Sequence, residues 1–345
     1  MGVFALARVG AATGHRPEHE PMQALRNLAV DQQVALLFVA LFGALMLTTM
    51  LAFGLTLRER GAAQSARDNR FTRDLRAVWV GATMFWLAWL AGPIGATLLA
   101  GALSFLALRE FVTLMHTRRG DHRPLILAFF VVLPLQYVIV GTRHFDLFTV
   151  FVPVYVFLAL PVVSALAGDP ERFLERNAKI QWGIMVCVYG LSHAPVLLLL
   201  DFARYAGRGA FLLFFLVIVA AAAQIAQEGA SRVLRRRPVA RQISRTFSIR
   251  AWLVGTAAGG FVGAALFWIT PFDPLQALLI AALSAGAGTL GELVMKALKR
   301  DAGVHYWGNR SSVTGAVGLL DRVAPLCFAA PVFFHSVRWY FQLYV

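Results

Sequence analysis

Long apolar runs separated by shorter basic segments dominate the pattern of the chain. Each run has about the length of roughly 20 residues that a helix needs to cross a hydrocarbon core. The runs lack the alternation of about ten-residue barrel strands. We therefore predict an all-α fold, a polytopic transmembrane helical bundle with about ten spans. The predicted spans cover residues 34–57, 77–92, 93–108, 125–141, 145–166, 180–200, 210–226, 251–270, 275–295 and 323–343.

The second and third spans form one apolar stretch that Gly92 and Pro93 interrupt. Because proline disfavours helix at the preceding residue, a tight helical hairpin is favoured over one long tilted helix. The hairpin places five loops on the same side, and these loops hold 25 of the 32 Lys and Arg residues. These loops are 58–76, 109–124, 168–179, 227–250 and 296–322. The positive-inside rule then makes them cytoplasmic and both termini non-cytoplasmic.

Composition agrees with this organisation. The chain is 59% hydrophobic and 14% charged, whereas soluble domains carry about a quarter charged residues. Topology accounts for most of the net charge of +14, and the short basic loops lack the aromatic pattern of nucleic-acid binding. We expect residues 1–33 to form an N-terminal tail and residues 34–345 to form one transmembrane domain. Cys187 and Cys327 fit buried small apolar residues without a metal-ligand spacing.

The last basic loop carries the strongest candidate chemistry. Glu292 lies near the end of an apolar helix, where a carboxylate is costly unless it pairs or binds a cation. Lys296 and Lys299 lie four and seven residues later, near the same helical face. A plain Glu292–Lys296 ion pair is one interpretation. Asp321 opens the last span, where an acid also suits a helix N-terminus.

The same residues fit phosphate chemistry. Nucleotidyl transfer needs a divalent metal held by carboxylates, and cations that offset developing charge. The candidate metal ligands are Glu292 and Asp321, and the candidate catalytic cations are Lys299 and Arg300. Glycines in this loop would allow the backbone to approach phosphate oxygens. They are Gly303, Gly308, Gly315 and Gly318.

A second set of candidate substrate-binding residues comes from the 227–250 loop and the start of the last span. Hydroxyl and guanidinium groups together suit phosphate binding, which points to Ser244, Arg245 and Arg322. A positive-inside loop with a serine helix cap is the alternative interpretation of the first two.

The ordered motifs of this region resemble the C-terminal signature of the phosphatidate cytidylyltransferase (CDP-diacylglycerol synthase) family. The matching motifs are Gly291-Glu292, Lys299-Arg300, Ala302-Gly303, Gly315 to Gly318, Asp321-Arg322 and Ala330-Pro331. Weaker matches are Arg109-Glu110-Phe111 after the early hairpin, Ile243-Ser244 and Gly259-Gly260. The resemblance covers about residues 73–345 and leaves the first span and the tail outside it.

Several positions depart from the family pattern. The family's Gly-Asp is Gly291-Glu292, which keeps a carboxylate but lengthens its side chain. Acids of the family are absent at Tyr306 and Ala324, and its Asn-Asp falls at Ala223-Gln224. The family's histidine falls at Ala316, and its Ser-Pro-Lys-Lys-Thr element keeps only Ser244 clearly. Glu292 and Asp321 remain as the two candidate ligands of one metal site.

The resemblance implies a membrane nucleotidyltransferase that converts phosphatidic acid and CTP to CDP-diacylglycerol and pyrophosphate with Mg²⁺. A homodimer is also compatible with this resemblance. The Arg- and Ala-rich composition favours a bacterial source, which would place the chain in the inner membrane. The missing acids motivate an alternative, a catalytically impaired homologue that binds lipid or a membrane partner. A transporter is a third interpretation, although the chain shows no paired inverted halves.

Overall fold

The computed structural model describes residues 29–58, 79–84, 86–88, 90–113, 117–200, 205, 207–234, 239–244, 247–303 and 318–341. These residues form helices and turns, and no strand occurs among them. Seven helical segments in this part of the chain are long and apolar enough to cross a membrane. The predicted all-α, polytopic fold is therefore confirmed, and the chain is an integral membrane protein.

The predicted count of ten spans is not confirmed. The seven segments that meet the length and composition of a span are Gln32–Met50, Gly92–Thr113, Arg119–Gly141, Phe145–Ala165, Phe173–Leu199, Gly209–Val233 and Pro274–Asp301. The other three predicted spans correspond to the shorter apolar helices Trp79–Ala88 and α12 (Ile249–Ala265), and to α14 (Leu319–Tyr340). Charged residues within α14, such as Asp321 and Arg338, lower its hydropathy below that of the seven spanning segments.

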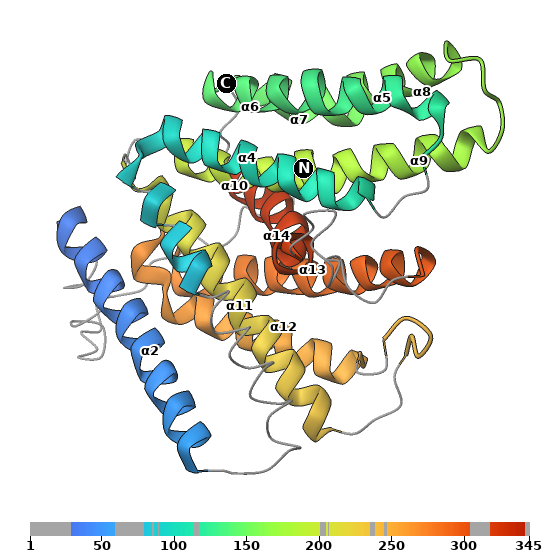
Figure 1. Cartoon of the computed structure of the whole chain (residues 1–345). Helices are drawn as coiled ribbons and strands as arrows, with labels where there is room; N and C mark the ends of the chain where they lie inside the picture. The colour runs from blue at the N-terminus through green and yellow to red at the C-terminus, as the bar shows by residue number, and fades with distance from the viewer. Residues whose placement is uncertain are drawn as a thin grey trace, which may run out of the picture.

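A sharp change of direction separates the helix at Trp79–Ala88 from α4 (Gly92–Thr113), as the cyan segments of Figure 1 show. Gly92 has φ +67°, a left-handed conformation that glycine adopts without the steric cost of a side chain. The break that the Gly92-Pro93 pair predicted is therefore present.

Three consecutive spans contain π-helical segments. The first joins η2 (Arg119–Asp121), α5 (His122–Leu127), η3 (Ala128–Val132) and α6 (Leu133–Gly141). The second joins α7 (Phe145–Val150), η4 (Phe151–Val156) and α8 (Phe157–Ala165), and the third joins α9 (Phe173–Ile184), η5 (Met185–Gly190) and α10 (Leu191–Leu199). Pro134, Pro153 and Pro195 lie in or shortly after these π segments. A proline removes one backbone donor, and a π turn is one local adjustment that accommodates the loss.

The helices are arranged in layers in Figure 1. The green segments α5 to α8 lie at one side, followed by α4 with α9 and α10, then α13 (Pro274–Asp301) and α14, and finally α11 (Gly209–Val233) and α12. Helix α2 (Val30–Arg58) lies at the periphery. It packs against the Trp79–Ala88 helix, where Trp79 Nε1 donates a hydrogen bond of 3.2 Å to Thr49 Oγ1.

Small residues allow α11, α12 and α13 to approach closely. A Cβ placed on Gly259 would lie 2.6 Å from Ala285 Cβ, and one on Gly263 would lie 2.2 Å from Ala281 Cβ. Such contacts leave no room for a larger side chain, which is how small residues bring transmembrane helices together. The Gly259-Gly260 pair noticed in the sequence thus lies in a helix–helix interface.

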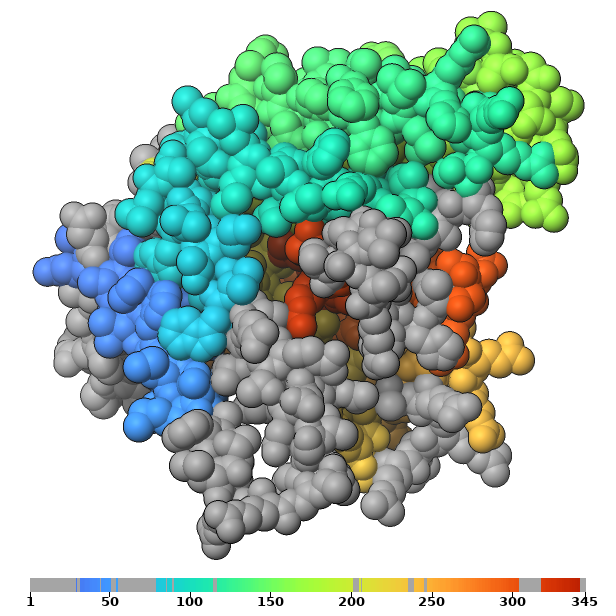
Figure 2. Space-filling view, in the orientation of Figure 1, coloured from blue at the N-terminus to red at the C-terminus, as the bar shows by residue number. Residues whose placement is uncertain are grey.

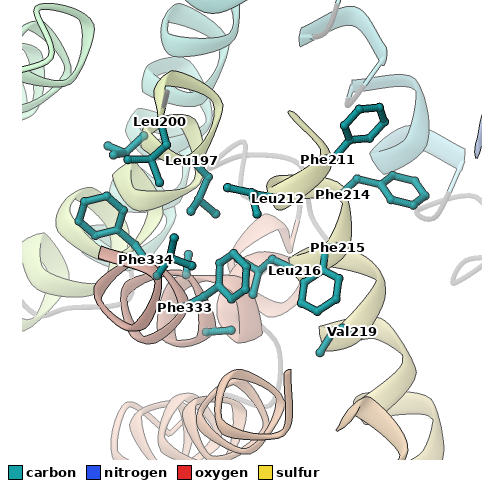
Figure 3. Packing of buried hydrophobic residues seen from close by; sticks show 14 of the residues in the cluster. Leu197, Leu200, Phe211, Leu212, Phe214, Phe215, Leu216, Val219, Phe333 and Phe334 are labelled. Carbon is teal, nitrogen blue, oxygen red and sulfur yellow. The ribbon is translucent and has the colours of Figure 1, made fainter. Parts of the chain in front are cut away.

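A large apolar cluster joins α10, α11 and α14. Figure 3 shows side chains of all three helices gathered in this cluster, among them Leu197, Leu212 and Phe334. Phe215 and Phe333 are fully buried there. Their ring centroids lie 5.7 Å apart. The two cysteines are buried and free, as predicted.

Polar contacts define two ends of the bundle. At one end, Glu110 at the end of α4 contacts the start of α14 at Leu319. At the other end, the last turn of α14 reaches the start of α7 through an ion pair between Arg338 and Asp146. The first end collects the described helix termini that flank four of the five predicted basic loops, so these termini lie on a common side of the bundle.

Candidate functional site at one end of the bundle

Glu292 lies on α13 and is held by two neighbours. Lys296 Nζ lies 2.6 Å from Glu292 Oε1, which forms the ion pair considered in the sequence. Gln224 of α11 donates a hydrogen bond of 3.1 Å from Nε2 to Glu292 Oε2. The side chain of Glu292 remains 26% exposed. The carboxylate is thus partly neutralised and still accessible.

Lys299 and Asp321 form the second ion pair of the site. Lys299 lies in the last turn of α13, and Asp321 lies in the first turn of α14. A cation at a helix C-terminus and an anion at a helix N-terminus both oppose the charge of the helix dipole. The lysine side chain is only 13% exposed, whereas that of Asp321 is 33% exposed. The pair therefore has a sheltered cation and a more open carboxylate.

Glu110 joins this pair from α4. It is 3% exposed, and its Oε2 accepts a hydrogen bond of 2.9 Å from the backbone N–H of Leu319. Its carboxylate also lies close enough to Asp321 for the two charges to interact. The other oxygen, Oε1, is buried and has no hydrogen-bond partner among the described residues. A buried carboxylate oxygen without a partner is costly.

Helix α13 connects the two ion pairs. Seven residues separate Glu292 from Lys299, which corresponds to about two turns and roughly 10 Å along the helix. A Cβ on Gly291 would lie 2.2 Å from the ring of Phe328. The glycine before Glu292 thus lets α14 pack directly on α13, and this packing sets the position of Asp321 relative to Lys299. Figure 2 shows part of α14, in red, reaching the surface below α4.

The remaining predicted residues are less tightly grouped. Ser244 is buried in the connection between α11 and α12, where its backbone N–H donates 2.7 Å to Ala240 O. Arg300 and Arg322 are exposed near the facing ends of α13 and α14. Arg245, Gly308 and Gly315 lie outside the described residues. Gly303 and Gly318 have φ values of +70° and +76°, which are conformations that favour glycine.

The described residues contain no group of three or more His, Cys, Asp or Glu side chains that could hold a metal ion. A metal ion coordinated entirely by protein side chains therefore does not fit the described residues. Mg²⁺ is commonly bound by one or two carboxylates together with the phosphates of a substrate. Glu292 and Asp321 are exposed enough to supply one such ligand each.

Two residues of the site were not assigned a role from the sequence. Glu110 was visible only as part of the Arg-Glu-Phe match, although a carboxylate at the end of an apolar helix is itself a signal. Gln224 was noted as a departure from an acidic position. Its contact with Glu292 shows that this position faces the site.

An apolar helical bundle with charged residues grouped at one end defines a polytopic membrane protein with a polar site at the membrane surface. The model of the cytidylyltransferase family matches residues 71–340. The chain therefore belongs to the cytidylyltransferase family, which confirms the resemblance and supports a nucleotidyltransferase-type activity. It is also 35% identical over 315 residues to the uncharacterized protein YnbB of Escherichia coli (strain K12), covering 90% of this chain and 99% of that protein.

Proposed function

We propose that the protein converts phosphatidic acid and CTP to CDP-diacylglycerol and pyrophosphate. A phosphate oxygen of phosphatidic acid attacks the α-phosphorus of CTP, and the bond from that phosphorus to the bridging oxygen of the β-phosphate breaks. Pyrophosphate leaves with the electron pair of that bond. The observation that carries the proposal is the convergence of the Lys299–Asp321 pair, Glu292 and Glu110 at one end of the bundle.

Lys299 is the principal catalytic cation in this proposal. Phosphoryl transfer depends on positioning and on groups that stabilise the charge that develops on the phosphate oxygens. The low exposure of the Lys299 side chain makes its interaction with a phosphate oxygen stronger than it would be in open water. Asp321 holds the lysine in place before the substrate binds, and Arg300 assists from the same helical turn.

The substrate phosphates contact the flanking residues. Arg322 presents a guanidinium group, which matches phosphate oxygens through paired hydrogen bonds. Arg245 lies outside the described residues and is proposed for the same role from the sequence alone. Ser244 contributes a hydroxyl donor. Mg²⁺ that arrives with CTP would gain a ligand from Glu292 or Asp321 and would offset phosphate charge.

The location of the site suits both substrates. CTP is soluble in water and phosphatidic acid lies in the bilayer, so the reaction needs a site at the membrane surface. The basic loops around the site would face the cytoplasm under the positive-inside rule. We therefore propose that this end lies in the cytoplasm, where CTP is available, and, from the Arg- and Ala-rich composition, that the membrane is a bacterial inner membrane.

Purified protein in detergent tests the proposal. Labelled CTP, phosphatidic acid and Mg²⁺ are incubated with the wild type, Lys299→Ala, Asp321→Ala and Glu292→Ala, and CDP-diacylglycerol is quantified. We expect product from the wild type and a loss of about 100-fold or more for Lys299→Ala. Arg232→Ala is the matched control, because among the described residues this exposed cation pairs with Glu228, four residues earlier. Full activity of Asp321→Ala would rule out this site.

A second candidate function rests on the pairing of both remaining acids with lysines. A site whose carboxylates are neutralised in this way, and which lacks several acids of the family, suits a homologue that binds lipid or a membrane partner without turnover. Retention of phosphatidic acid without CTP binding or product would support this function. Turnover stimulated by substrate would exclude it.

A further inference from the structure

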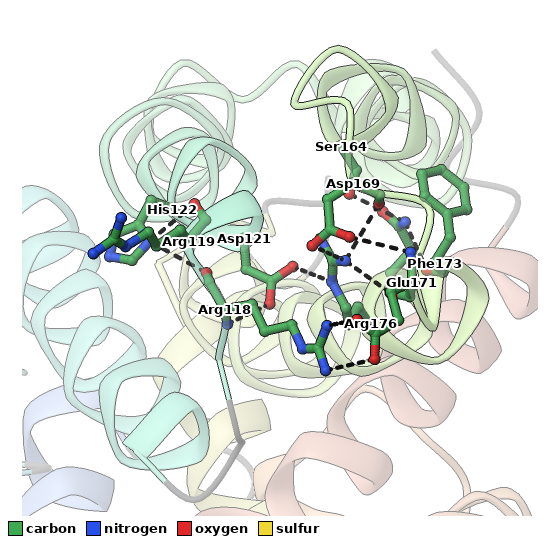
Figure 4. A network of polar contacts seen from close by, with 10 residues as sticks. Arg118, Arg119, Asp121, His122, Ser164, Asp169, Glu171, Phe173 and Arg176 are labelled. Carbon is green, nitrogen blue, oxygen red and sulfur yellow. Dashed lines mark hydrogen bonds and ion pairs between the residues drawn. The ribbon is translucent and has the colours of Figure 1, made fainter.

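A second polar site lies where the α4–α5 and α8–α9 connections meet. A pocket of about 450 Å³ opens there, and four cationic and two acidic side chains line it. The lining residues are Thr117, Arg118, Asp121, Arg172, Glu175, Arg176, Lys179 and Ile180. None of them belongs to the candidate transferase site. Figure 4 shows the polar network that forms one wall of this pocket.

The rigid part of the network is centred on Arg176. This side chain is 6% exposed, and its Nε and Nη1 donate hydrogen bonds of 2.7 Å to Asp121 and Asp169. Nη1 also donates 2.8 Å to the Glu171 carbonyl oxygen. Its Nη2 is buried without a hydrogen-bond partner among the described residues. The network fixes the two connections to each other and leaves one guanidinium nitrogen unsatisfied.

The cations at the rim are held more loosely. Arg172 and Lys179 share one acid, Glu175, at 3.9 Å and 2.7 Å. Arg118 pairs with Glu171, and all five side chains are more than a third exposed. Exposed ion pairs contribute little to stability. A phosphate group that enters the pocket can therefore replace a carboxylate as the partner of these cations at small cost.

The pocket lies at the N-terminal end of the Phe173–Leu199 span, before its apolar run begins. Ile180 lines it and begins the apolar run of its span, and Trp182 is partly exposed two residues later. Tryptophan is enriched at the boundary between membrane and water. Glu175 and Lys179 lie one turn apart on the same face of α9, and Arg172 is the residue that directly precedes this helix. Cationic side chains at this level face the headgroups of the bilayer.

We propose that this pocket binds the phosphate headgroup of an anionic phospholipid. Arg172 and Lys179 contact the phosphate oxygens, Arg118 closes the rim, and the Arg176 network keeps the pocket open. The acyl chains run beside α9 below Ile180. This proposal needs only the membrane position of the pocket and does not depend on transferase activity.

The position of the pocket favours a lipid over free phosphate as the source of the headgroup. A lipid is already concentrated at this depth, and its acyl chains remain in the bilayer when the headgroup binds. Free phosphate must give up its hydration to enter a pocket that also contains two carboxylates. Inorganic phosphate should therefore displace the lipid only at much higher concentration.

Native mass spectrometry of the full chain in detergent tests the proposal, because it counts bound lipids individually. Dioleoyl phosphatidic acid is titrated against the wild type, an Arg172→Gln/Lys179→Gln double variant and Glu175→Gln. Dioleoyl phosphatidylcholine and inorganic phosphate are the comparison ligands. Arg232→Gln is the control variant, because it removes an exposed cation of α11 outside the pocket.

We expect the double variant to bind one phosphatidic acid about tenfold or more weakly, because two charge-assisted contacts are lost. Glu175→Gln should bind that lipid more tightly, because it releases both cations from their acid. A variant that merely misfolds would not gain affinity, so this second result separates binding from folding. Unchanged lipid counts and affinities in both variants would overturn the proposal. If inorganic phosphate displaced the lipid at concentrations similar to that of the lipid, the ligand of the pocket would be free phosphate and the lipid assignment would be wrong.

Discussion

The carboxylate of Glu110 accepts a hydrogen bond from the backbone N–H of Leu319, 209 residues later in the chain. The first residues of a helix have N–H groups without intrahelical partners. Because α14 begins at Leu319 and its N-cap residue Gly318 provides no side-chain cap, an acid from α4 caps it instead. This contact ties the end of α4 to the turn that carries Asp321.

Replacement of Glu110 should therefore weaken the start of α14. We expect Glu110→Ala to lower the free energy of unfolding by about 1–2 kcal/mol, the range for loss of a helix cap. Glu110→Gln keeps an acceptor oxygen and should retain most of the stability. Unfolding in a detergent titration measures both. Glu228→Ala is the control, since that acid is exposed and its ion pair in the described part of the chain is with Arg232. Equal stability of Glu110→Ala and wild type would show that the cap contributes nothing.

Lys299 and Asp321 should act as a unit. Residues in one ion pair show non-additive effects, because the second substitution removes a partner that is already lost. We expect the Lys299→Met/Asp321→Asn double variant to lose no more transferase activity than Lys299→Met alone. Initial rates at saturating CTP and saturating Mg²⁺ measure the coupling, so that weaker Mg²⁺ binding by the Asp321 variant does not enter the comparison. Losses that simply multiply would show that the two side chains contribute separately.

The requirement for Mg²⁺ can be tested at the same residues. Removal of divalent ions with a chelator should abolish turnover, and added Mg²⁺ should restore it. We expect Asp321→Asn to raise the Mg²⁺ concentration for half-maximal rate about tenfold, since one negative ligand is removed. Asp301→Asn, at the exposed end of α13, should leave that concentration unchanged. The same Mg²⁺ dependence in Asp321→Asn and wild type would exclude Asp321 as a ligand.

The Arg118–Glu171 pair should make stability depend on pH. A hydrogen bond from Arg118 and its positive charge lower the pKa of Glu171 below its usual range. A carboxyl whose pKa is lower in the folded state stabilises the fold above its unfolded pKa, which is about 4.3. That contribution is lost as the pH falls through the lowered pKa. The difference in melting temperature between wild type and Glu171→Gln should therefore be constant near neutral pH and vanish in acid. A difference that grows in acid would contradict this assignment.

Packing at Gly291 gives a stability prediction with a matched control. Its Cβ would lie 2.2 Å from Phe328, so Gly291→Ala must separate α13 from α14 or displace the ring. We expect a loss of about 1–3 kcal/mol. Gly229 is helical, exposed and has no neighbour within 4 Å of a Cβ, so Gly229→Ala should be neutral or slightly stabilising. Thermal unfolding in detergent compares the two variants. A neutral Gly291→Ala would show that this contact relaxes freely.

The amino-acid sequence by itself determined the class of fold, because span length and apolar composition are local properties that the bilayer imposes. It also predicted the break at Gly92 and offered the Glu292–Lys296 pair as one interpretation, since a backbone constraint and a four-residue helical spacing act within one segment. The order of motifs along the chain indicated the family. The sequence did not determine the number of spans. In α14, for example, charged residues and prolines lower the mean hydropathy of a segment that otherwise has the length of a span.

Only the tertiary structure decided which distant residues share a site. Glu110 reaches Leu319, Gln224 reaches Glu292, and Arg176 reaches Asp121 because helices that are far apart in sequence pack side by side. Such contacts depend on the rotation and depth of each helix in the bundle, which small residues at the interfaces set. No periodicity along the chain encodes these two quantities, so the cap on α14 and the second polar pocket became visible only in the folded protein.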